Sequence, residues 1–206
     1  MGKRVLIISS SPRKNGNSDT LCHSFAKGAK ENGSEVTEIF INDKKINYCK
    51  ACGYCETHNG ACSQKDDMDE IIDEVLKSDV IVFSSPVYFY SISGQLKTLI
   101  DRLVAVYTKI TGKEIYYLLT AAENGKSTFD RADACLDGLC DCLSDIKIKG
   151  MIYAGGVWKK GEINSTRYIQ QAYDMGAAVW KSFAFYYISH LFLFIMQERK
   201  KWKVMM

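Results

Sequence analysis

Four cysteines fall within one short segment of the sequence. Residues 47–67 read NYCKACGYCETHNGACSQKDD, so the cysteines are spaced C-x2-C-x2-C-x6-C. Closely spaced thiolates of one loop can converge on an iron-sulfur cluster, whereas a zinc site more often uses separated pairs of ligands. Thiols that hold no metal, as a redox pair or as part of the loop's shape, are a further interpretation. The spacing leaves these alternatives open for Cys49, Cys52, Cys55 and Cys62.

The other cysteines and the histidines give weaker signals. Their neighbours are mainly apolar residues of helical patterns, and in such surroundings a cysteine behaves as a small hydrophobic residue. We therefore expect burial of Cys22, Cys135, Cys140 and Cys142. No partner is evident for the histidines, which we expect in the core or in solvent: His23, His58 and His190.

A second chemically distinctive stretch, SSSPRKNGNSDT, spans residues 9–20. It is rich in hydroxyls and amides, follows an apolar run and leads into a helical pattern. The N-terminus of a helix offers free N–H groups and a favourable dipole to an anion, and a guanidinium adds a charged partner. We therefore assign a phosphate group to Ser11, Arg13, Asn17 and Ser18. The alternative is an ordinary polar turn with a helix cap.

The same stretch argues against several familiar phosphate sites. Neither GxxxxGK[ST] nor GxGxxG occurs in it, which disfavours ATP, GTP and an NAD-binding Rossmann domain. A phosphoryl-accepting receiver domain needs Mg²⁺ and hence carboxylates after its first strand. Three serines occupy that place here.

Apolar runs predict the strands that position these loops. Four near-continuous runs are typical of strands buried on both faces of a parallel sheet: RVLIISS from Arg4, DVIVFSS from Asp79, KEIYYLL from Lys113 and KGMIYAG from Lys149. A fifth run, SEVTEIFI from Ser34, is more polar and predicts an edge strand.

Three- and four-residue apolar spacings predict helices between the strands. They cover residues 21–29, 68–76 and 96–104, and further helices are expected over about 127–144 and from about 165. Ser18 and Ser93 are expected N-caps, while Asp67 with Glu70 approximates a capping box.

Strict alternation of strands and helices predicts an α/β fold with a doubly wound parallel sheet. Five strands fit the flavodoxin-like order 2-1-3-4-5, with helices on both faces. Ligands of such sheets bind beyond the carboxyl ends of the strands, where the strand order reverses. The loops after the first and third strands are therefore expected to form the site. We expect one domain over residues 1–180, followed by an extension over 181–206.

Composition limits the partners and the compartment. The chain has 206 residues, 47% of them hydrophobic, and a net charge of +3. This charge is too small to indicate a nucleic-acid partner. The apolar run after Arg4 is too short for a signal peptide, so we expect a cytoplasmic protein whose eight cysteines stay reduced.

Three motifs together resemble one known family. They are SSSPRKNGNS, CKACGYC followed by KDDM, and SSPVYFYSISGQLKTLIDR at residues 84–102. The sequence is similar to the NAD(P)H-dependent FMN reductase family of flavodoxin-like proteins over roughly residues 3–176. The branch that it most resembles includes the iron-sulfur flavoproteins.

This resemblance implies the cofactor FMN and further site residues. The FMN phosphate would lie in the first loop, and the isoalloxazine ring would contact Pro86, Val87, Tyr88 and Phe89. The loop after the fourth strand would close the pyrimidine end of the ring through Ala121 and Glu123. By the same resemblance, the four clustered cysteines would ligate a 4Fe-4S cluster. We interpret Lys97, Asp101 and Arg102 as structural or interface residues.

The resemblance implies an enzyme, an FMN-dependent oxidoreductase that forms a homodimer. It would take hydride from NAD(P)H and reduce a quinone, a nitro compound or another acceptor, with no dedicated catalytic acid or base. The alternative is an iron-sulfur flavoprotein that carries electrons from ferredoxin through FMN and a 4Fe-4S cluster. A flavin-free binding module is a third possibility.

The extension contains the apolar segment FAFYYISHLFLFIM, residues 183–196, followed by ERKKWK. Fourteen helical residues would span about 21 Å, which is short of a bilayer core of roughly 30 Å. We therefore expect no transmembrane segment. The apolar segment is expected to pack on another subunit or over the flavin edge, with a membrane surface as the alternative.

Overall fold

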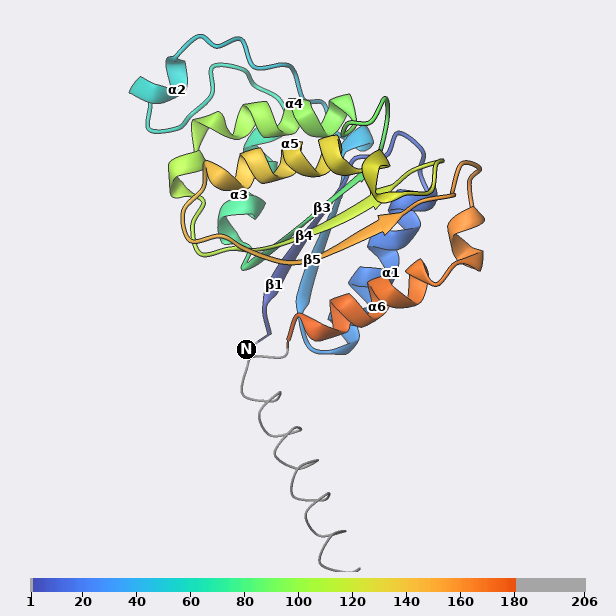
Figure 1. Cartoon of the computed structure of the whole chain (residues 1–206). Helices are drawn as coiled ribbons and strands as arrows, with labels where there is room; N and C mark the ends of the chain where they lie inside the picture. The colour runs from blue at the N-terminus through green and yellow to red at the C-terminus, as the bar shows by residue number, and fades with distance from the viewer. Residues whose placement is uncertain (1, 181–206) are drawn as a thin grey trace, which may run out of the picture.

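The computed structural model describes residues 2–180. It contains five strands and six α-helices in nearly strict alternation (Figure 1). The strands are β1 (Arg4–Ser9), β2 (Glu35–Phe40), β3 (Val80–Pro86), β4 (Glu114–Thr120) and β5 (Lys147–Ala154). The helices are α1 (Asn17–Glu31), α2 (Tyr54–Thr57), α3 (Met68–Lys77), α4 (Gly94–Arg102), α5 (Asp130–Asp141) and α6 (Tyr168–Ala178). Our expectations for the extension 181–206 and for His190 lie outside the described residues.

The strands form one parallel sheet in the order β2-β1-β3-β4-β5. This confirms the predicted fold class and order. Helices α1 and α6 cover one face, and α3, α4 and α5 cover the other (Figure 1). Alternate residues of β1 enter the two cores: Val5 and Ile7 pack on the α1 and α6 side, while Leu6 and Ile8 pack on the other.

One of the two edge strands, β5, is less buried than the sequence predicts. We expected β5 to be buried on both faces, but Ile148 is 40% and Met151 is 37% exposed. The reason is that β5 pairs with β4 on one side only within the described chain. The predicted edge position of β2 is confirmed.

One predicted N-cap was wrong, and one predicted capping box does not form. Gly16, not Ser18, is the N-cap of α1, because the Ser18 hydroxyl bonds to the Thr120 hydroxyl on β4 at 2.7 Å instead. Asp67 is the N-cap residue of α3, at the predicted position, but its side chain makes no capping hydrogen bond. Its carboxylate accepts the N–H of Lys45, while Glu70 pairs with Lys44, so there is no capping box.

Short 3₁₀ turns explain two shifted helix boundaries. The helix expected over residues 127–144 is a turn, η4 (Lys126–Thr128), followed by α5. The helix expected from about residue 165 is likewise a turn, η5 (Glu162–Ser165), followed by α6. Three more such turns occur: η1 (Ile41–Asp43), η2 (Leu103–Ala105) and η3 (Tyr107–Lys109).

No helix within residues 2–180 has both the length and the apolar character needed to cross a membrane.

Ser93 is the N-cap of α4, as the sequence predicts. Its buried hydroxyl accepts the Leu96 N–H at 3.3 Å and contacts the Ser10 hydroxyl at 2.9 Å. We expect Ser93→Ala to lower the free energy of unfolding by about 1–2 kcal/mol, since a cap and a buried hydrogen bond are lost together. Denaturant unfolding measures this. Ser91→Ala is the control, because the Ser91 hydroxyl has no hydrogen bond in the described chain, and an equal loss in both variants would contradict the capping role.

Candidate functional site

The loops after β1 and β3 meet at the carboxyl edge of the sheet. Ser10 donates both its N–H, at 3.0 Å, and its hydroxyl, at 2.7 Å, to the Ser84 carbonyl. The Ser93 N–H in turn bonds to the Ser85 hydroxyl at 2.9 Å. Buried serines in both loops therefore hold them against each other, at the position where the strand order reverses.

A cleft opens beside this junction. Its residues come from five segments, namely the loop after β1, the start of α1, the ends of β3 and β4 with the residues that follow them, and the loop after β5: Ser11, Arg13, Asn17, Ser18, Pro86, Val87, Tyr88, Thr120, Ala121, Ala122, Val157 and Trp158. The structure thus brings together most of the site residues that we predicted from the sequence. Thr120, Ala122, Val157 and Trp158 were missed. Thr120 and Ala122 could have been inferred because they are the neighbours of Ala121. No local sequence signal marks Val157 and Trp158 in the loop after β5.

The first turn of α1 faces the cleft with free donors. Gly16 caps α1 without a side-chain hydrogen bond, and the backbone N–H groups of Asn17 and Ser18 have no acceptor within residues 2–180. Such N–H groups and the helix dipole favour an anion. The Arg13 guanidinium, which bonds to the Trp158 carbonyl at 3.2 Å, adds a positive charge at the same place.

Asn17 uses its side chain to hold the opposite wall of the cleft. Its amide donates to the Lys159 carbonyl at 3.0 Å and accepts the N–H groups of Gly161 at 3.1 Å and Ile163 at 3.3 Å. These bonds fix the loop after β5, which carries Trp158. The Asn17 amide therefore shapes the cleft, and its backbone N–H remains the group available to a ligand.

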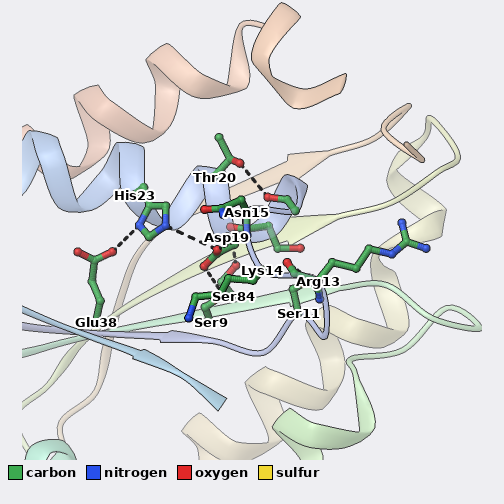
Figure 2. A network of polar contacts seen from close by, with 12 residues as sticks. Ser9, Ser11, Arg13, Lys14, Asn15, Asp19, Thr20, His23, Glu38 and Ser84 are labelled. Atoms are coloured by element: carbon green, nitrogen blue, oxygen red, sulfur yellow. Dashed lines mark hydrogen bonds and ion pairs between the residues drawn. The ribbon is translucent and has the colours of Figure 1, made fainter. Parts of the chain in front are cut away.

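The buried carboxylate of Asp19 holds the loop after β1 in place (Figure 2). Asp19, only 4% exposed, accepts the Asn15 N–H at 2.7 Å and the Ser9 hydroxyl at 3.2 Å. Asn15 has a φ of 55°, so this bond holds a left-handed residue at the turn. His23 lies 3.6 Å from Asp19 and 2.8 Å from Glu38. Our expectation that His23 lacks a partner was wrong, and the four-residue spacing of Asp19 and His23 was a usable signal.

The turn after β3 separates Phe89 from its neighbours. Tyr88 and Ser91 exchange two backbone hydrogen bonds, at 2.9 and 3.0 Å, while Phe89 and Tyr90 have φ angles of 49° and 61°. Phe89 is fully exposed at the tip of the turn. It therefore does not line the cleft, unlike Pro86, Val87 and Tyr88.

Glu123 also lies outside the cleft, because it anchors this turn. Its carboxylate accepts the Tyr90 hydroxyl at 3.1 Å, and this hydrogen bond raises the pKa of Tyr90. Arg131 lies over the Tyr90 ring. Glu123 and Arg131 thus fix the turn that carries Tyr88, the aromatic wall of the cleft.

The cysteine loop, residues 47–67, projects beyond α4 and carries the short helix α2 (Figure 1). Its four cysteines line one groove of about 820 Å³ together with residues of α4 and α5. We call this space the cysteine groove. All eight cysteines of the described chain are free thiols.

The later cysteines differ in their surroundings. Burial raises the pKa of the Cys22 thiol to about 12, which fits the predicted role as a small core residue. Cys140 is also buried, but Cys142 is exposed and Cys135 is half-buried. Both of the latter line the cysteine groove. Our expectation of burial was therefore wrong for these two, because Cys135 on α5 and Cys142 directly after it border the open groove between α5, α4 and the cysteine loop.

Arg102 joins the cysteine loop to α4. Its side chain is 2% exposed and that of Asp66 is fully buried, with 2.7 Å between Nη1 and Oδ2. Burial acts to raise the pKa of Asp66, but hydrogen bonds from Arg102 and from the N–H groups of Asn47 and Met68 outweigh it and lower the pKa to about 2. This carboxylate is therefore the anchor of the loop's C-terminal end.

The two cofactors implied by the sequence fit the described residues to different degrees. The cleft offers anion donors, hydroxyls and an aromatic wall, which suit the phosphate and the ring of FMN. Its volume of about 70 Å³ is below the roughly 300–1,000 Å³ of ligand pockets, so much of a flavin would lie along the open mouth. Within residues 2–180, no three Cys, His, Asp or Glu side chains are grouped closely enough to hold a metal ion. The four loop thiols suit a cluster by their chemistry and because they line one groove. To bind a cluster, the loop would have to change its conformation so that the thiols come closer to one another.

Comparisons with known proteins identify the family and its relatives. Residues 3–134 match the family described as NADPH-dependent FMN reductase. The chain is 43% identical over 97 residues to an iron-sulfur flavoprotein of Archaeoglobus fulgidus, covering 47% of this chain and 44% of the relative. It is 38% identical over 106 residues to an iron-sulfur flavoprotein of Methanocaldococcus jannaschii, covering 52% and 53%. The chain thus spans about half the length of the curated relatives it matches.

Solved structures show the same fold at low sequence identity. An FMN-dependent NADH-azoreductase from Bacillus anthracis, in complex with FMN, has a TM-score of 0.65 at 15% identity, covering 88% of this chain and 100% of that one. An NAD(P)H:quinone oxidoreductase from Methanothermobacter marburgensis has a TM-score of 0.62 at 14% identity, covering 88% and 99%. The family match covers more than half of this chain and includes the loops after β1 and β3. The chain therefore belongs to the NADPH-dependent FMN reductase family.

Proposed function

We propose that this protein is an FMN-dependent oxidoreductase that takes hydride from NAD(P)H and reduces a quinone, a nitro compound or another acceptor. The observation that carries the proposal is the cleft itself. It combines free N–H groups at the start of α1 with Arg13 on one side and the aromatic wall of Tyr88 on the other. An anion site next to a flat apolar wall matches the phosphate and the ring of FMN.

Each wall of the cleft has a distinct task in this proposal. The N–H groups of Asn17 and Ser18 and the Arg13 guanidinium bind the phosphate. Pro86, Val87 and Tyr88 support one side of the ring, and Ala121 borders its pyrimidine end. Bound FMN would supply the redox chemistry, namely hydride acceptance from a reduced nicotinamide and transfer of two electrons to the acceptor. The residues of this chain bind and orient the flavin and leave its outer face open to both substrates.

The proposal is tested with the full chain loaded with FMN and freed of unbound flavin. Oxidation of NADH and of NADPH is followed with menadione as the quinone and nitrofurazone as the nitro compound. We expect acceptor-dependent oxidation faster than that of the same concentration of free FMN. Rates no higher than those of free FMN, with both nicotinamides and both acceptors, would refute the proposed reaction.

The cysteine groove favours a second candidate, an iron-sulfur flavoprotein that transfers electrons between a ferredoxin, a 4Fe-4S cluster and FMN. The loop cysteines share one groove, and the two archaeal relatives described above bear the name iron-sulfur flavoprotein. In this proposal Cys49, Cys52, Cys55 and Cys62 hold the cluster. Protein purified without oxygen is assayed for iron and acid-labile sulfide. Equimolar iron and sulfide support the cluster, and their absence leaves the cysteines as free thiols.

Three further expectations complete the proposal. The protein acts as a homodimer, works in the cytoplasm, and has a small-molecule electron acceptor or a redox protein as its partner. Size-exclusion chromatography with light scattering tests the dimer, and a monomer at micromolar concentration would contradict it.

A further inference from the structure

Four hydrogen bonds of one guanidinium tie together both ends of the cysteine loop. Arg102 Nη1 donates to the Asn47 carbonyl at 2.8 Å, two residues before Cys49, and to Asp66 Oδ2 at 2.7 Å. Its Nη2 donates to Asp66 Oδ1 at 3.1 Å and to the Cys62 sulfur at 3.4 Å. One planar group thus reaches the start of the loop, its end and one of its thiols.

Arg102 holds the base of the loop, and a separate contact with Lys109 holds its tip. Cys49 and Cys52 are exposed, and several residues between the first and last cysteine need left-handed backbone angles: Ala51, Gly53, Asn59 and Gly60. Asp66 also accepts the Asn47 N–H at 3.0 Å, so the Arg102–Asp66 pair closes the loop at its base. Removal of either partner of such a pair leaves the other charge buried without a counter-charge.

We propose that Arg102 is the positioning residue of the cysteine groove, which fixes Cys62 as a ligand for a soft metal or an iron-sulfur cluster. The inference rests on the metal-binding form of the proposed function. Arg102 touches no reacting atom and acts through Cys62. Donors to a ligating group orient it and commonly change metal affinity 10–100-fold. A lysine cannot replace the fork that binds carboxylate, carbonyl and sulfur together.

Lys109 provides a matched control. Its ammonium also holds the cysteine loop, through the Asn59 carbonyl at 2.9 Å and the Asn59 side-chain oxygen at 3.2 Å. It lies at the tip of the loop and contacts no sulfur. Lys109→Met therefore removes a cation and a tether from the same loop without touching a ligand.

The test measures Cd²⁺ affinity of the full-length, reduced, metal-free chain through the thiolate-to-metal absorption band. We expect Arg102→Lys, and Asp66→Asn as a second variant, to weaken Cd²⁺ binding about 10–100-fold, with Lys109→Met within about twofold. In a Cys62→Ser background the effect of Arg102→Lys should vanish, because the two residues act as one unit. Circular dichroism confirms that each variant folds.

Three results would overturn the proposal. They are no Cd²⁺ binding by the wild-type chain, equal losses in Arg102→Lys and Lys109→Met, or an Arg102→Lys effect that persists unchanged without Cys62. Failure of the cluster hypothesis can be distinguished from failure of this proposal. The first appears as missing iron and sulfide in anaerobic protein, whereas the second appears in the Cd²⁺ affinities of the Arg102 and Lys109 variants.

Discussion

Replacing Arg13 and Ser18 together by alanine should weaken FMN binding about 100-fold. Both residues line the cleft, and the double change removes the charged donor of the proposed phosphate site together with the Ser18 hydroxyl, whose bond to Thr120 fixes the start of α1. Hydrogen bonds to charged groups contribute about 1.5–3 kcal/mol and neutral ones about 1 kcal/mol. A combined loss of about 3 kcal/mol corresponds to about 100-fold in the dissociation constant. Equilibrium dialysis with FMN measures the change.

Lys14→Ala is the charge-matched control for this prediction. Lys14 belongs to the same loop, but its ammonium pairs with Asp43 at 2.9 Å, and it does not line the cleft. Its removal changes the net charge by the same amount as that of Arg13, and we expect FMN affinity to stay within about threefold, since an exposed charge contributes less than 1 kcal/mol. Full retention of FMN by the double variant, or an equal loss in Lys14→Ala, would show that the phosphate lies elsewhere.

Gly176→Ala should destabilise the fold by about 3 kcal/mol. Helices α1 and α6 touch backbone to backbone, so a Cβ on Gly176 would lie 2.1 Å from the Phe25 carbonyl oxygen, and one on Gly28 would lie 2.1 Å from that of Tyr173. No rotamer relieves a clash with backbone, so the helices must separate, and overpacking of this kind costs about 1–3 kcal/mol or more. In a chain of this size such a loss lowers the melting temperature by roughly 6–12 °C.

Gly138→Ala is the matched control, because it changes a glycine within α5 where an added Cβ meets no atom within 4 Å. Alanine favours a helix over glycine by up to about 1 kcal/mol, so this variant should melt at the same or a higher temperature. Opposite signs for the two variants are the expected result of differential scanning calorimetry. Unchanged stability of Gly176→Ala would mean that α1 and α6 are not packed this closely.

The sheet was predictable because its central strands have no competing pattern. Apolar runs such as the one after Arg4 are buried on both faces, and only a parallel sheet between two helix layers covers them. The start of α1 was less predictable. Ser18 has the residue type of an N-cap, yet its hydroxyl bonds to Thr120, about a hundred positions away in the sequence. A tertiary contact therefore displaced the local preference.

Sequence alone could predict only those cleft residues that have a suitable side chain and also follow a recognisable strand. Ser11, Arg13 and Tyr88 follow strands directly, so strand order placed them at one edge. Trp158 and the groups bound by Asn17 come from the loop after β5, and no spacing rule links them to residues near position 17. Arg102 shows the same limit, because its contacts with Asp66 and Cys62 depend on how the cysteine loop folds over α4.

In the function that we propose, the start of α1 binds the phosphate of FMN. Side-by-side titration of the full-length wild-type protein with FMN and with riboflavin, which has the same ring but no phosphate, tests it most directly. We expect one FMN per chain, bound at least about 100-fold more tightly than riboflavin, because the charged donors of the cleft have no partner in riboflavin. Equal affinities for the two flavins, or no binding of either, would contradict it.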